Sequence, residues 1–205
     1  EFTEDTYLVS LWEVKEDISA IFFDEVNGND ENNGAAVYVN GEKGKIHNSL
    51  FENNTAGRSG GAIYWNYLTG IVTTSNFTFN KAKSGGAIYW NHEYGEVSDC
   101  EFANNTAIED GGAIYWNDDY GTVDSSSFEN NTAGSYGGAI FWDYDNGKVT
   151  GSVFIKNAAN DGGAIYFREG FILKSKEQTV ENSTFLAIFI FGVLVTLGYT
   201  FWQFS

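Results

Sequence analysis

The stretch GGAIYWN at residues 60–66 decides the fold, because it recurs four more times at nearly constant spacing. The first glycines of successive copies are separated by 25, 26, 26 and 25 residues. The later copies are GGAIYWN at 85–91, GGAIYWN at 111–117, GGAIFWD at 137–143 and GGAIYFR at 162–168. A repeat of this length indicates a solenoid, in which each repeat packs against its neighbours in the chain.

Two further motifs run in step with the first one. Phe-x-x-Asn recurs from Phe51/Asn54 onward, and Gly-x-Val recurs from Gly70/Val72 onward. Each repeat therefore holds three short β-type segments separated by Gly or Asn, none of them long enough for a helix. This pattern predicts an all-β chain that forms a right-handed parallel β-helix of about six coils. The expected domains are an N-terminal cap (1–32), the repeats (33–170), a linker (171–184) and a C-terminal transmembrane helix (185–204).

Side chains along a strand point alternately to its two faces. In each GGAIYW segment, Ile and Trp should therefore point into the solenoid, and the tyrosine between them should point out. The regular spacing stacks these aromatic residues into an outward column, which is the predicted interaction surface: Tyr64, Tyr89, Tyr115, Phe141 and Tyr166. The asparagines of Phe-x-x-Asn should lie at a turn and form a hydrogen-bonded amide ladder along the coils.

Composition limits the possible partners. The formal net charge is −17, with only 11 Lys and Arg residues and no basic cluster, which argues against nucleic-acid binding. The single cysteine, Cys100, excludes an intrachain disulfide. Cys100 aligns with Ser75 and Ser126 of the neighbouring repeats, and we therefore expect a buried packing residue and not a nucleophile.

An acidic column follows the tyrosine column in the loop after each Trp-Asn pair. Glu93, Asp119 and Asp145 occupy equivalent positions on successive coils. Carboxylate oxygens are ligands that Ca²⁺ prefers, so these residues are a weak candidate calcium site. The alternative is a solvated acidic edge. This alternative is favoured, because a calcium-binding loop has a fixed Asp/Gly spacing that this sequence lacks. No other cofactor is predicted.

Five Asn-x-Ser/Thr triplets are candidate glycosylation sites if the chain follows a eukaryotic secretory route. The alternative is that a repeat rich in Asn and Thr generates such triplets by composition. The triplets begin at Asn53, Asn76, Asn104, Asn130 and Asn182.

Residues 185–204 read FLAIFIFGVLVTLGYTFWQF and carry no charge. About 20 apolar residues are the length that a membrane-spanning helix needs. Gly192 and Thr196 are small residues one helical turn apart and would let a second helix approach. We therefore expect a single-pass protein held in the bilayer, with its acidic β-helix on the extracytoplasmic, cell-surface or lumenal side; a buried core segment is the alternative.

The paired Phe-x-x-Asn and Gly-Gly-Ala-Ile motifs resemble the repeats of chlamydial polymorphic membrane proteins. They also resemble the wider group of adhesin-like parallel β-helix proteins on microbial surfaces. The resemblance covers roughly residues 33–167 and implies surface display and adhesion. It departs from that family at the C-terminus, where those proteins end in a membrane β-barrel and this sequence has a single apolar segment.

Two functions follow from these patterns. The preferred one is a non-catalytic, membrane-anchored β-helix that acts in protein–protein contact, as an adhesin-like structural protein or as an accessory subunit of a membrane complex. The alternative is a carbohydrate-active β-helix, either a polysaccharide lyase or glycoside hydrolase, or a glycan-binding module. Such an enzyme needs paired acids, or acids with a cationic base. In the sequence, Arg58 and Arg168 look isolated, and no coil shows an unusual cluster of acids and bases.

Overall fold

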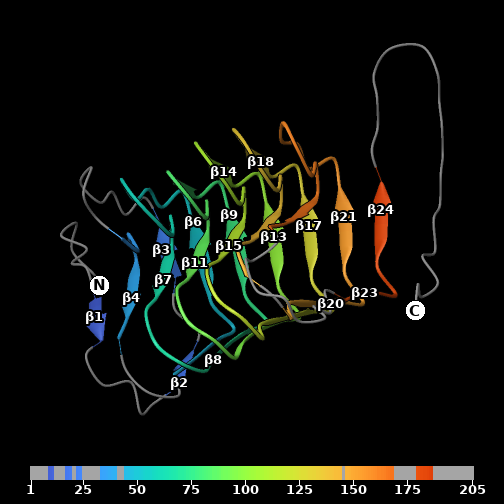
Figure 1. Ribbon diagram of the computed structural model, residues 1–205. Coiled ribbons are helices and arrows are strands. Elements are labelled where there is room, and N and C mark those ends of the chain that lie inside the picture. The colour runs from blue at the N-terminus through green and yellow to red at the C-terminus, as the bar shows by residue number, and fades with distance from the viewer. Residues whose placement is uncertain are drawn as a thin grey trace.

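The computed structural model describes residues 9–11, 17–19, 22–24, 33–40, 44–144, 146–168 and 179–186. These residues form a parallel β-solenoid whose coils stack side by side along one axis (Figure 1). Five turns run from β4 to β22, which are six strands of one sheet within the predicted repeat region. The predicted all-β parallel solenoid is thereby confirmed.

Three long sheets and one short sheet line the solenoid, and every pairing is parallel. Sheet A contains β1 (Val9–Leu11), β4 (Val37–Val39), β7 (Ile63–Trp65), β11 (Ile88–Trp90), β15 (Ile114–Trp116), β19 (Ile140–Trp142) and β22 (Ile165–Phe167). Sheet B contains β2 (Asp17–Ser19), β5 (Lys45–His47), β8 (Gly70–Thr73), β12 (Gly95–Ser98), β16 (Thr122–Asp124), β20 (Lys148–Thr150) and β23 (Thr179–Glu181). Sheet C contains β3 (Phe22–Asp24), β6 (Leu50–Glu52), β9 (Asn76–Thr78), β13 (Glu101–Ala103), β17 (Ser127–Glu129), β21 (Val153–Ile155) and β24 (Thr184–Leu186). The short sheet D contains β10 (Lys81–Ala82), β14 (Thr106–Ala107) and β18 (Thr132–Ala133), which the sequence did not predict.

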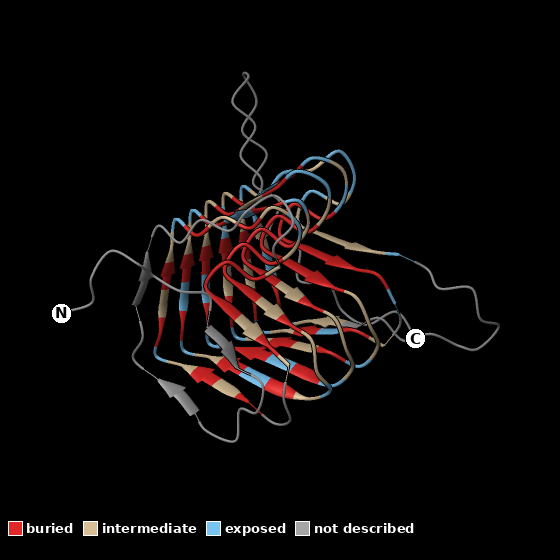
Figure 2. Ribbon diagram, turned by 90° about the vertical axis from the view of Figure 1, so that its left-hand side faces the viewer, coloured by how far each residue is buried: buried red, intermediate tan, exposed pale blue. Residues whose placement is uncertain are grey.

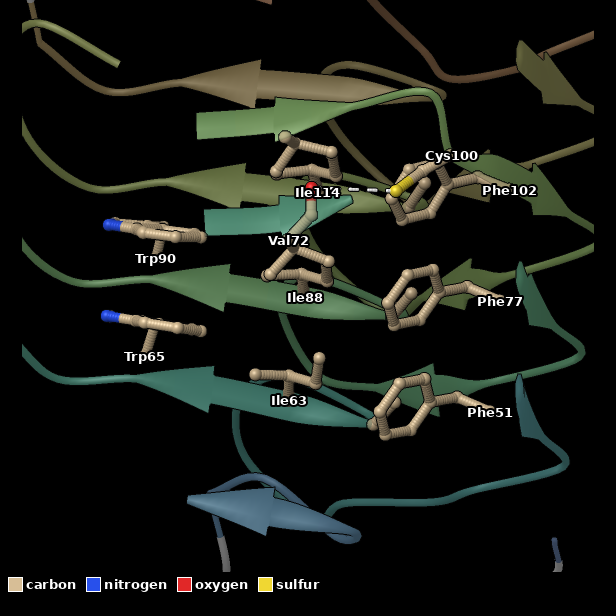
Figure 3. Close-up of a cluster of buried hydrophobic side chains, with 14 of the residues drawn as sticks. Phe51, Ile63, Trp65, Val72, Phe77, Ile88, Trp90, Cys100, Phe102 and Ile114 are labelled. Atoms are coloured by element: carbon tan, nitrogen blue, oxygen red, sulfur yellow. Dashed lines mark hydrogen bonds between the residues drawn. The ribbon is translucent and has the colours of Figure 1, made fainter. Parts of the chain in front are cut away.

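Equivalent residues of successive repeats pair directly. Ile88, for example, pairs with Ile63 on one side and with Ile114 on the other. Like side chains therefore stack on like side chains, and buried residues alternate with less buried ones along most strands (Figure 2). Inside, the phenylalanines of sheet C form a column with ring centroids 4.8 Å apart, beside a column of isoleucines (Figure 3).

The tryptophans form a second buried ring column at the end of the sheet A strands. Trp65 and Trp90 stack with centroids 4.6 Å apart and are fully buried (Figure 3). The glycine of Gly-x-Val makes room for this column, because a Cβ on Gly95 would lie 2.1 Å from Cε2 of Trp90. The Gly-x-Val motif is therefore a packing requirement of the tryptophan.

The predicted amide ladder is present inside the turn after sheet C. The side-chain amide of each asparagine donates to Oδ1 of the next, at 2.9 Å from Asn54 to Asn80 and 3.0 Å from Asn80 to Asn105. From Asn80 onward, each Nδ2 also donates to a phenylalanine carbonyl of the preceding coil, as in Asn80 to Phe51 at 2.9 Å. A buried amide is thus satisfied at every coil, which removes the cost of burying it.

Cys100 is buried, as expected. Its thiol donates to the carbonyl oxygen of Ser98 at 3.1 Å, and its backbone N–H donates to Oγ of Ser126. Burial raises the pKa of the Cys100 thiol to about 12. A thiol held protonated in this way is a packing group, because the thiolate is the reactive form.

The predicted boundaries change at both ends. Strands β1–β3 lie in the region expected to be a cap, but they continue sheets A, B and C. At the other end, β23 lies in the region expected to be a linker and continues sheet B. Phe185 and Leu186, the first two residues of the expected transmembrane helix, belong to β24, whereas residues 187–204, with Gly192 and Thr196, lie outside the described residues. In the described part of the chain, no helix has the length and apolarity to span a membrane.

Candidate functional site

The predicted aromatic column exists on the outer face of sheet A and begins one coil earlier than expected, at Tyr38. Tyr64 stacks on Tyr38 and on Tyr89, with ring centroids 5.2 Å apart in both pairs. Tyr64, Tyr89 and Tyr166 are partly buried, but only 8% of Tyr115 and 1% of Phe141 are exposed. The prediction of an exposed interaction surface is therefore wrong at Tyr115 and Phe141, where neighbouring side chains cover the rings.

Ring stacking limits what this column can bind. The planes of Tyr64 and Tyr89 differ by 11°, and those of Tyr89 and Tyr115 by 14°. Tyr64 and Tyr89 thus each have another ring on both faces, which leaves ring edges and hydroxyl groups to reach the surface. Burial raises the pKa of the Tyr89 phenol, with a further contribution from Tyr64. Tyr64 and Tyr89 accordingly offer no flat ring face on which a sugar could stack.

A second amide ladder runs beside the aromatic column, and the sequence reasoning missed it. Nδ2 of Asn66 donates to Oδ1 of Asn40 at 3.1 Å, and Nδ2 of Asn91 donates to Asn66 at 2.8 Å. The ladder continues with Asn117, which donates to Asn91 at 2.9 Å. The next residue of this column is Asp143, where the fourth GGAI motif reads GGAIFWD. A carboxylate cannot donate the hydrogen bond that would extend the ladder.

The ladder ends in a cluster of charged and aromatic side chains. Only 6% of the Asp143 side chain is exposed, and it forms an ion pair with Arg168, the next residue of the same column. The hydroxyl of Tyr115 donates to Oδ2 of Asp143 at 2.9 Å. Arg168 also lies over the Phe141 ring, 5.6 Å from its centroid. The expectation that Arg168 is isolated is therefore wrong, because its partner lies one coil away.

Asp110 and Tyr136 extend this cluster along the column that precedes the paired glycines. The backbone N–H of Tyr136 donates to Oδ1 of Asp110 at 3.1 Å, and the Tyr136 ring packs against Tyr166 with centroids 4.6 Å apart. Burial raises the pKa of Asp110, and Glu109 and Asp143 add to the shift, whereas the Tyr136 hydrogen bond and Arg168 oppose it. Two carboxylates and a guanidinium thus interact beside aromatic rings. This arrangement of acids and a base has catalytic or polar-binding potential.

The candidate calcium column gains no support as a metal site. Glu93 and Asp119 lie in adjacent loops, joined by the backbone hydrogen bond from Tyr94 to Asp119 at 3.4 Å. Asp145 lies outside the described residues. Among the residues that the structure does describe, no three His, Cys, Asp or Glu side chains are grouped closely enough to hold a metal ion.

The candidate glycosylation asparagines all have exposed or partly exposed side chains. Asn53, Asn104 and Asn130 adopt positive φ angles of 57°, 57° and 54° in the turn just before the buried amide ladder. Asn76 begins β9, and Asn182 lies in the turn between β23 and β24.

Comparison with family models agrees with this architecture. The model of the right-handed β-helix region matches residues 35–202, which is most of the chain, and the chain belongs to this family. The solenoid is accordingly right-handed. Comparison with curated proteins found no match, and comparison with solved structures found none either.

Proposed function

We propose that this chain is a non-catalytic β-helix that is anchored in a membrane and acts by contact with protein partners. The observation that carries the proposal is that the repeated side chains contact their equivalents on neighbouring coils. Inner rings of the aromatic column stack on both faces, and both amide ladders bond from coil to coil. The repeats therefore build a rigid rod, and they do not form a series of identical ligand sites.

The anchor that we propose is the uncharged segment that follows β24, residues 187–204. It is long enough for a short membrane-spanning helix, and Gly192 and Thr196 would let it pack against a helix of a partner. The net charge of −17 and the Asn-x-Ser/Thr triplets favour an extracytoplasmic position for the solenoid. The protein would then be either an adhesin-like surface rod or an accessory subunit of a membrane complex.

The anchor can be tested by membrane extraction of the full chain. Leu194→Arg combined with Val195→Arg places two charges in the middle of the apolar segment and should release the protein from membranes at alkaline pH, because each arginine costs about 2.5–3.5 kcal/mol at a helix centre. Ser205→Arg, beyond the segment, is the control and should leave the protein in the membrane fraction. Retention of the double variant in the bilayer would exclude this anchor.

The contact function can be tested by cross-linking in intact membranes, followed by native mass measurement of the detergent-extracted protein. We expect a defined complex of greater mass than one chain. A strictly monomeric particle without cross-linked partners would exclude the accessory subunit.

A second candidate is a carbohydrate-active β-helix. Right-handed β-helices occur in adhesins and also in polysaccharide-active enzymes. The cluster of Asp110, Asp143 and Arg168 favours this candidate, since paired acids beside a cation suit hydrolysis or elimination. Incubation with neutral and acidic glycans, with and without Ca²⁺, tests it. Cleavage that Asp110→Asn and Asp143→Asn abolish would establish an enzyme, whereas the absence of both cleavage and binding would remove this candidate.

A further inference from the structure

Two exposed tyrosines stack on each other at the corner between sheets A and B. Tyr94 is 53% exposed and Tyr120 is 47% exposed, with ring centroids 5.1 Å apart and planes within 8°. The neighbouring positions of this column are Thr69 and Asn146, which carry no ring. This two-ring stack therefore has a ring face at each end that no further ring of the column covers.

These tyrosines occupy a backbone conformation that does not suit them. Their φ angles are 57° and 56°, and Thr69 and Asn146 have φ angles of 58° and 57° at the equivalent positions. Asparagine enters this left-handed region readily, whereas a bulky side chain is strained there. Tyrosine at both positions is therefore not explained by the turn itself, and strain of this kind often accompanies a functional surface.

The corner is also acidic. Glu93 and Asp119 directly precede the two tyrosines, and the hydrogen bond from Tyr94 to Asp119 holds the two loops in register. Desolvation, followed by Glu93, Tyr120 and Asp119, raises the pKa of the Tyr94 phenol. A negative potential beside an open ring face attracts a cation, and a planar cation can also stack on the ring.

We propose that the corner formed by Leu68, Glu93, Tyr94, Asp119 and Tyr120 binds an arginine-bearing segment of a protein partner. The guanidinium group would stack on an open tyrosine face and pair with the Glu93 or Asp119 carboxylate. Leu68, which is exposed in the adjacent coil, provides apolar surface for the flanking residue of that segment. Arginine fits better than lysine, because its planar group can stack and bond at the same time. This proposal rests on the proposed contact function and names the surface that carries it.

Fluorescence anisotropy tests the proposal with the full chain and a labelled octa-arginine peptide at about 150 mM salt, where exposed charges more than about 8 Å apart are largely screened. Octa-lysine serves as the matched cationic peptide. We expect tighter binding of octa-arginine, and a loss of about tenfold when Tyr94→Asn and Tyr120→Asn are combined, which is the size of one or two cation–π contacts. Asparagine is chosen because Asn146 already occupies this column at the same φ.

Phe79→Asn is the control for the tyrosine variants. Phe79 has a φ angle of 56° and is as exposed as Tyr94, but it lies in the turn that follows sheet C, where Asn53 and Asn104 take the equivalent positions. This variant should bind octa-arginine like the unaltered chain. An equal loss in Phe79→Asn, or no loss in the tyrosine variants, would overturn the proposal.

A second pair of variants separates local from overall charge. Glu93→Gln with Asp119→Asn should weaken octa-arginine binding, whereas Glu101→Gln with Glu129→Gln on sheet C changes net charge equally and should not. Equal losses of octa-arginine binding in the two pairs would mean nonspecific attraction and would overturn the site. Binding of a neutral oligosaccharide that depends on the two tyrosines, without binding of the peptide, would overturn it as well. If membrane cross-linking still yields a partner complex when both tyrosines are replaced, the corner is refuted while the contact function stands.

Discussion

Replacing one rung of the buried amide ladder should destabilise the solenoid severely. Asn105 accepts hydrogen bonds from the backbone N–H and from Nδ2 of Asn80, both at 3.0 Å. It donates through Nδ2 to Oδ1 of Asn131 and to the Phe77 carbonyl, both at 2.9 Å. Asn105→Ala removes all four bonds and deprives at least two buried backbone groups of a partner, the Asn80 N–H and the Phe77 carbonyl. At about 1–3 kcal/mol for each unsatisfied group, the loss is about 2–6 kcal/mol, a large share of a typical folding free energy.

Equilibrium denaturation, followed by emission of the buried tryptophans, measures this loss. Asn157→Ala should cost less, because Asn157 is partly buried and its described hydrogen bonds lie on one side of the ladder. Asn104→Gly is the control, since it changes the adjacent turn residue, whose φ of 57° glycine accepts, and it should cost less than about 1 kcal/mol. If Asn105→Ala costs no more than Asn104→Gly, the ladder contributes nothing to stability and our reasoning fails.

Three further predictions concern packing, the Asp143–Arg168 ion pair and the thiol. Gly95→Ala should destabilise the solenoid by about 3 kcal/mol or more in denaturant titration, because its Cβ would overlap the buried Trp90 ring. Gly163→Ala is the control: its Cβ would meet no atom closer than 3.5 Å, and it should change stability by less than about 1 kcal/mol. Arg168→Ala should cost about 1–3 kcal/mol, because the buried Asp143 carboxylate loses its ionic partner and keeps only the hydrogen bond from Tyr115. The double variant that adds Asp143→Asn should recover much of this loss, and no recovery would show that the carboxylate is not the cause. Cys100, whose thiol pKa is raised to about 12, should resist iodoacetamide at pH 8 while the chain is folded and should react when it unfolds, so alkylation of the folded chain would contradict this reading. The unfolded thiol ionises at its lower, ordinary pKa, and the burial of Cys100 should therefore reduce the free energy of unfolding only as the pH rises above that ordinary value.

Most of the fold could be predicted from the sequence because the repeat is in register with itself. A spacing of 25 or 26 residues places Ile63 beside Ile88 and Phe51 beside Phe77, so a pattern read along the chain is also a pattern of contacts. The alternation of Ile, Tyr and Trp gave the correct faces. The role of Gly70 was missed, because the ring that it accommodates lies across a corner and not on a neighbouring strand.

The candidate site was harder to predict, because it depends on departures from the repeat. Asp143 and Arg168 are 25 residues apart and look unrelated until the coils are stacked. A signal was nevertheless present, since the last residue of the motif changes from Asn to Asp and then to Arg in consecutive copies. The burial of Tyr115 and Phe141 was not predictable from alternation, because alternation gives the face of a sheet and not the side chains that cover it.

The Asp143–Arg168 pair also bears on where function lies along the rod. An asparagine at either position would have continued the ladder of Asn66, Asn91 and Asn117 without burying a charge. Asp143 instead places a carboxylate in a nearly closed environment, while more than half of the Arg168 side chain stays exposed. Burying an ion pair seldom adds stability over neutral side chains of similar size. The pair is therefore poorly explained as reinforcement of the solenoid, and the C-terminal end of the aromatic column is the place where a glycan-dependent activity, if cleavage is observed, would have to be found.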